Sequence, residues 1–303
     1  MNNTDLRYHV ASLSAIFLAL GIGIVIGTAF VGSPLVSRQT GMLHRLETHV
    51  TELREETRER ERTEEALAQL LPQAIRGTLR GKRVLVVQMG NYADATLAAT
   101  ETLTLAGAIP MTVQLPPDAW RARLNMPDVA PDRIADEARK LATRLASGAT
   151  DFWGEYRESG LLISSDREDS LAGAVGYVVL VGGETGGGDT TLLVQRDLPL
   201  IEEWQSAGLT VVAVEPRKTE ISYLPTYRGK GIATIDAIDR AAGKIALPFA
   251  LSGETGAFGY RTDAGQILPP IVGSEPSPDP SPAPTATPKV IPILPSPGAT
   301  QPQ

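Results

Sequence analysis

The sequence predicts an α/β protein, in which a mostly parallel, Rossmann-like three-layer domain follows an N-terminal transmembrane helix and a coiled-coil stalk. Three observations lead to this prediction. An uncharged apolar stretch lies near the N-terminus, a charged segment with a heptad pattern follows it, and two strand–helix–strand units come next. The expected boundaries are 1–9 for a short N-terminal segment, 10–32 for the transmembrane anchor, 33–75 for the stalk, 76–268 for the α/β domain and 269–303 for a disordered tail rich in proline and serine.

The composition excludes several classes of function. The chain has 303 residues, a net charge of −7 and no cysteine. Without cysteine there are no disulfides, thiolate metal sites or cysteine nucleophiles. No basic stripe lies outside the early charged helix, so nucleic acid is not expected as a partner.

The apolar stretch from Val10 to Val31 carries no charge and no proline. As a helix it would be roughly 33 Å long, which matches a bilayer core of roughly 30 Å. A cleaved signal peptide is the alternative, and Gly27-Thr28-Ala29 resembles a cleavage site. Because a signal peptide has an apolar region of only about 7 to 15 residues, and helix-forming sequence resumes almost at once, we expect an uncleaved anchor.

Small residues recur at every fourth position of this stretch and would form one ridge on a helix. They are Ala11, Ala15, Ala19, Gly23 and Gly27. Such a ridge allows a second helix to approach closely, although glycine and alanine are also common in membrane helices in general. We expect the ridge to pair two copies of the anchor.

The flanking charges do not determine the orientation of the anchor. Arg7 and the α-amino group precede the span, and Arg38 and Arg45 follow it, so the positive-inside count is nearly balanced. Because the N-terminal segment is very short and a whole domain follows the span, we expect a signal anchor in the cell membrane. The N-terminus would be cytoplasmic and the body extracytoplasmic.

The charged segment after the anchor has apolar residues at the a and d positions of a heptad. The seam consists of Leu43, Leu46, Val50, Leu53, Leu67 and Leu71. It is interrupted by polar residues at Thr57, Arg60 and Glu64. This pattern favours a parallel coiled-coil homodimer, and the alternative is a solvated single helix held by Glu–Arg pairs. Pro72 is expected to mark the end of the stalk.

Two strand–helix–strand units predict the parallel sheet of the body. Apolar runs at 81–89 and 109–115 flank a helix that Asp94 is expected to cap. Similar runs at 175–181 and 209–214 flank a helix that extends to about residue 207. Each unit implies a parallel pair with a right-handed crossover.

The remaining segments are less regular. Residues 116–160 are expected to be helical, and the aromatic residues Trp120, Trp153 and Tyr156 form either packing or an exposed contact surface. The apolar run 245–251 fits a strand or a helix, because Pro248 disfavours the interior of both. The tail contains too few apolar residues to form a core.

A glycine-rich loop follows the third strand, at the place where doubly wound sheets bind anions and nucleotides. It contains Gly182, Gly183, Gly186, Gly187, Gly188 and Asp189. The loop matches neither of the two glycine-rich phosphate-binding motifs, and loops of this composition are usually turns. A small-ligand sensor that uses this loop is therefore a third hypothesis.

No enzyme is expected, because the histidines are His9, His44 and His49, all outside the body. A serine–histidine–acid site in the body is therefore excluded for this chain alone. The carboxylates of the body show no recognisable metal-binding spacing.

The order of these parts resembles the MctB-like copper transporter family. The resemblance begins with RYHVASLSAIFLALGIGIVIG at 7–27 and continues through the stalk and the strand that starts at Gly81. It also includes the late segment with TIDAID at 234–239 and GKIAL at 243–247. The resemblance implies an envelope protein of copper homeostasis or export, with no catalytic motif. For some relatives it implies a role in envelope assembly or division through a partner protein.

No cofactor is expected, and copper enters only as an ion that is transported or sensed. Copper(I) prefers thioether or thiolate ligands and copper(II) prefers imidazole, which points to Met42, His44 and His49 on the stalk. Spacings of two and five residues do not place all three on one face of a helix. These three residues are the candidate copper ligands, and a scaffold that presents its body to an envelope partner is the alternative function.

Overall fold

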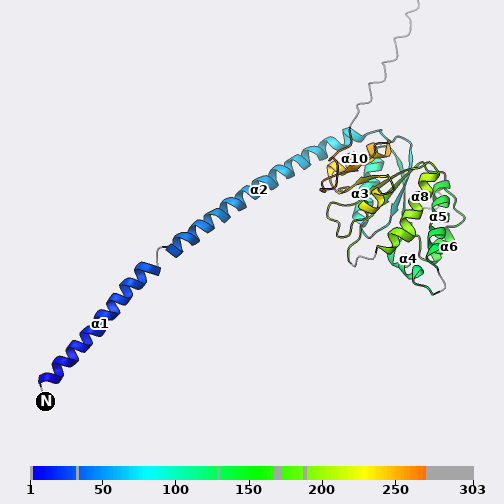
Figure 1. The fold of residues 1–303 in the computed structure, drawn as a ribbon. Coiled ribbons are helices and arrows are strands. Elements are labelled where there is room, and N and C mark those ends of the chain that lie inside the picture. Colours follow the sequence, from blue (N-terminus) through cyan, green and yellow to red (C-terminus); the bar gives the residue numbers. More distant parts are fainter. Residues whose placement is uncertain are drawn as a thin grey trace, which may run out of the picture.

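The computed structural model describes residues 3–31, 34–127, 130–164, 166, 172–186 and 190–270. The predicted disordered tail lies outside the described residues from 271 onward. Figure 1 shows a long helical arm with a folded body at the end of α2.

The first helix, α1 (Asn3–Val31), contains a 21-residue segment, Arg7–Gly27, that is long and apolar enough to cross a membrane. The expected apolar N-terminal helix is therefore present.

The second helix, α2, runs from Pro34 to Ile75 and contains Pro72. The expectation that Pro72 ends the helix is wrong, because the helix continues for three more residues. A proline inside a helix removes one backbone hydrogen bond. Packing of this last turn against the body offsets the loss, since Ile75 is fully buried and Leu71 packs against the same core.

The body contains a six-stranded sheet of order β2-β1-β3-β4-β5-β6, in which all paired neighbours are parallel. The strands are β1 (Arg83–Gln88), β2 (Ile109–Gln114), β3 (Tyr177–Val181), β4 (Thr210–Val214), β5 (Ala233–Ile235) and β6 (Ala257–Phe258). The parallel sheet and both strand–helix–strand units are confirmed. The strands β5 and β6 are not predicted from the sequence, because they are too short to give a periodic signal.

Helices cover both faces of the sheet, so the body has three layers (Figure 1). One face packs against α4 (Pro117–Leu124), α5 (Pro131–Ser147), α6 (Trp153–Glu158), the π-helical turn η1 (Leu193–Asp197), α8 (Leu198–Ser206) and α9 (Leu224–Arg228). The other face packs against the end of α2, α3 (Ala93–Leu105) and α10 (Ala241–Leu251). Side chains alternate along each strand, so Leu85 and Val87 enter the first core and Val84 and Val86 the second.

Three local expectations are decided by the structure. The run 245–251 is part of helix α10, which includes Pro248. Asp94 is not a cap, because α3 starts at Ala93 and Asp94 therefore falls in its first turn, and no side chain caps this helix. The aromatic residues Trp120 and Trp153 are buried, so they contribute packing rather than a contact surface.

Candidate functional site

The strand order reverses between β1 and β3, and the loops that follow these two strands would form the walls of a ligand crevice in a doubly wound sheet. The loop after β1 contains Gly90, and the loop after β3 contains Gly182, Gly183 and Gly186. Gly187, Gly188 and Asp189 lie outside the described residues. The distances between these two loops therefore decide whether a ligand could lie between them.

The two loops pack directly against each other. A Cβ atom added to Gly90 would lie 1.7 Å from the carbonyl oxygen of Gly183, so the two backbones are in contact. Beside them, Asn91 donates from Nδ2 to Thr185 Oγ1 over 2.9 Å, and its Oδ1 accepts from the Thr185 amide over 3.0 Å. These contacts leave no room for a ligand between Gly90 and Gly183.

Under the glycine loop lies the buried carboxylate of Glu215, directly after β4. It accepts hydrogen bonds from the Ser222 hydroxyl at 2.7 Å and from the Tyr223 amide at 2.6 Å. A Cβ on Gly182 would approach Glu215 Oε1 to 3.2 Å, so the glycine lets the loop lie close over this carboxylate. Burial raises the pKa of Glu215 to about 7, although the hydrogen bonds oppose the shift.

This pKa predicts a pH dependence of stability. The folded pKa of about 7 exceeds the ordinary value of 4.5, so the folded state holds this proton more tightly than the unfolded chain. The protonated carboxyl of Glu215 therefore contributes its full stabilisation of the fold below pH 4.5. This contribution is lost as the pH rises through 7, by about 3 kcal/mol in total.

Glu215→Gln keeps an acceptor for Tyr223 and should remove this loss of stability. Thermal unfolding of both full chains in detergent at pH 4.5 and 8 measures the difference. A difference between the two chains that does not change with pH would contradict the assignment.

A second polar cluster joins α4 to the glycine loop. Arg121 donates to both carboxylate oxygens of Glu184, at 2.7 and 2.5 Å, and the Tyr223 hydroxyl donates to the same carboxylate at 2.7 Å. Burial pushes the pKa of Glu184 upward, but the bonds from Arg121 and Tyr223 outweigh it and hold that pKa below its usual value. The carboxylate is therefore ionised and fully engaged, and it holds α4 against the loop.

A third cluster lies deeper in the body and consists of Arg196, Asp197 and Tyr227, which are all at most 1% exposed. Arg196 donates to Asp197 Oδ1 at 2.6 Å and to the carbonyl oxygens of Met89 and Leu115, where β1 and β2 end. The Tyr227 hydroxyl donates to the other oxygen of Asp197. This cluster is not predicted from the sequence, where its local signal is an adjacent Arg–Asp pair within an apolar helical segment.

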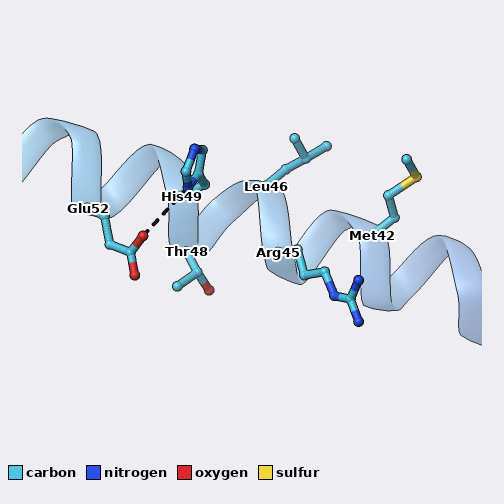
Figure 2. Close-up of a pocket in the computed structure, with 6 residues that line it drawn as sticks. All are labelled: Met42, Arg45, Leu46, Thr48, His49 and Glu52. Carbon is cyan, nitrogen blue, oxygen red and sulfur yellow. Dashed lines mark ion pairs between the residues drawn. The ribbon is translucent and has the colours of Figure 1, made fainter.

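The proposed metal ligands lie on α2 rather than on the body. Met42 and His49 project from the same side of the helix with Leu46 between them, as Figure 2 shows, and Met42 is 69% exposed. Nδ1 of His49 lies 3.6 Å from Oε2 of Glu52. The side chain of His44 lies outside the described part of the chain. In the described ranges, no group of three or more His, Cys, Asp or Glu side chains could hold a metal ion. The copper ligands therefore stay a prediction.

The pairing surfaces of the arm are also exposed within one chain. The seam residues Leu46, Val50 and Leu53 are 57%, 43% and 51% exposed, while Leu43 has no described side chain. The five ridge residues of α1, Ala11, Ala15, Ala19, Gly23 and Gly27, are exposed as well. At the other end of the seam, Leu67 is half-buried, and Leu71 packs against the core of its own body. The two ends of the seam thus have different surroundings.

Comparison with known proteins identifies the family of this chain. The chain is 25% identical to proteins named "Copper transporter MctB" from Mycobacterium tuberculosis, strains H37Rv and CDC 1551, and from Mycobacterium bovis. Each match covers 82% of this chain and 91% of the relative. No solved structure matches the chain. A family model described as "Copper transport outer membrane protein, MctB" matches residues 4–151 and 125–269, so the chain belongs to this family.

Proposed function

We propose that this protein acts in copper homeostasis, in efflux or tolerance, as a single-pass protein of the cell envelope. The observation that carries the proposal is the family match, which extends from the apolar helix to the end of the body. The helix α1 anchors the chain in the cell membrane, with a cytoplasmic N-terminus and an extracytoplasmic body. The protein has no enzymatic activity in this proposal.

A second candidate function is a scaffold that does not transport copper and presents its α/β body to an envelope partner. The closed switch point favours it, because Gly90 and Gly183 occupy the space that a ligand at the switch point would need. The lack of cysteine and of a multi-ligand metal group among the described residues also favours it. Copper would then affect the protein only indirectly.

The test of the first candidate is the copper tolerance of a strain that lacks the gene. We expect the deletion strain to stop growing at a lower copper concentration than the wild type, and the full chain to restore growth. A chain whose anchor is replaced by a cleavable export signal should fail to restore it. Unchanged copper tolerance of the deletion strain would reject the first candidate and leave the scaffold.

The same strain separates direct from indirect copper handling. If Met42 and His49 bind the ion, Met42→Leu with His49→Gln should lower copper tolerance and weaken copper binding by the full chain in detergent, measured by calorimetry. Thr48→Ala, on the same exposed turn of α2, is the control and should change neither. Normal tolerance and binding in the double variant would remove these two residues from the mechanism.

We also propose a parallel homodimer. Two features support it independently: the exposed seam of α2 around Leu46, Val50 and Leu53, and the exposed ridge of small residues on α1. Leucine and valine at a and d positions lose water-exposed apolar area when two such helices pair. Membrane anchoring aligns the two copies in the same direction.

A further inference from the structure

The seam residues of α2 have different neighbours at the two ends of the helix. Its a and d positions are exposed at Leu46, Val50 and Leu53. The same stripe continues through Thr57 and Arg60 and then reaches the body of its own chain. The same face of α2 is therefore exposed in its first part and contacts the body in its last part.

From Glu64 onward, this face is occupied within the chain. Glu64 Oε1 accepts a hydrogen bond of 2.6 Å from the backbone amide of Ala241, the first residue of α10. One turn further on, Leu67 lines a groove between stalk and body, opposite Arg217 and Tyr260. Leu71 then packs against the core of the body, so a second helix cannot cover the same positions.

The segment just before this contact disfavours a paired helix by its charges. In a parallel, in-register pair, Arg60 would face Arg60 of the partner subunit and Glu64 would face the partner's Glu64, at d and a positions. Glu56 at a g position would lie next to the partner's Glu61 at an e position. Like charges at all three levels oppose pairing, whereas Leu46, Val50 and Leu53 upstream favour it.

We propose that the stalks of two copies pair only along the segment that includes Leu46, Val50 and Leu53. The two helices separate between Thr57 and Glu64, so that each body stays on its own stalk through Glu64 and Leu71. The polar interruption of the heptad is thus the point of separation. This inference rests on the homodimer that is part of the proposed function, and it defines the surface through which the second copy binds.

Cysteine cross-linking tests the inference directly, because the chain contains no cysteine of its own. Single variants Leu46→Cys, Leu53→Cys and Leu67→Cys of the full chain would be oxidised with diamide in membranes. We expect disulfide-linked dimers for the first two and at least a tenfold lower yield for Leu67→Cys. Glu55→Cys, on the outer face at the height of Leu53, is the matched control and should not cross-link.

A second measurement does not depend on a half-buried thiol. Spin labels on Glu55→Cys and on Gln69→Cys occupy the same outer heptad position and are both exposed. Separated helices should give a clearly longer distance between the two copies at 69 than at 55, in pulsed electron paramagnetic resonance. Equal distances, or efficient cross-linking of Leu67→Cys, would show a continuous coiled coil and overturn the inference. An absence of cross-links at every position would reject the dimer, whereas the copper tolerance assay would be unaffected.

Discussion

Replacing Arg196 with methionine is expected to destabilise the protein by about 3 to 5 kcal/mol, the usual loss when one member of a buried ion pair is removed. The guanidinium of Arg196 neutralises Asp197, which is fully buried, and it also satisfies the carbonyl oxygens of Met89 and Leu115. Methionine fills much of the same space but donates no hydrogen bond. Among the described residues, the side chain of Asp197 would then keep only the bond from the Tyr227 hydroxyl.

Thermal unfolding of the full chain in detergent measures this effect, and the midpoint should fall by roughly 10 °C for a body of this size. Arg139→Met is the matched control, because the Arg139 side chain is 43% exposed and pairs with Asp136 and Glu202 near the surface, where such pairs contribute about 0 to 1 kcal/mol. Adding Asp197→Asn to Arg196→Met removes the uncompensated charge and should recover part of the loss. A loss below 1 kcal/mol for Arg196→Met would mean that the buried charges do not stabilise the junction of β1 and β2.

The sequence predicts the sheet well because its central strands are buried on both faces. The runs that become β1, β3 and β4 are apolar and rich in valine, and glycines separate them from the neighbouring helices. The strands β5 and β6 have three and two residues, so their place in the sheet follows from tertiary contacts. Helix α10 is similar, since burial of its apolar residues outweighs the local effect of Pro248.

The sequence indicates where the candidate site lies, but not whether it has space for a ligand. The pattern of strand and glycine loop singles out the loop after β3, and the strand order of the structure places this loop at the switch point. Whether it is open depends on the contact between Gly90 and Gly183, which are far apart in the chain. The polar break in the stalk is likewise visible as a pattern, but its physical reason includes Ala241, which lies 177 residues after Glu64. Local periodicity carries no information about such long-range contacts.

Gly90→Ala is expected to destabilise the body by about 3 kcal/mol or more, because the new Cβ would lie 1.7 Å from the carbonyl oxygen of Gly183. That oxygen belongs to the backbone, so the clash cannot be relieved by rotating a side chain. Relief requires the loop after β3 to move away from the loop after β1. The hydrogen bonds between Asn91 and Thr185 would then weaken, and amide hydrogen exchange should become faster at Thr185.

Gly154→Ala is the matched control, because Gly154 lies in helix α6 and its added Cβ would meet no atom within 4 Å. This change should stabilise the protein slightly, by up to about 1 kcal/mol, since alanine has the higher helix propensity. If Gly90→Ala unfolded at the same temperature as the unchanged chain, the two loops would be separable, and the crevice could open to a ligand. A large loss confined to Gly90→Ala would instead mean that this family member uses the switch point of its sheet for packing. Contacts with a ligand or partner would then lie on the stalk or on the outer surface of the body.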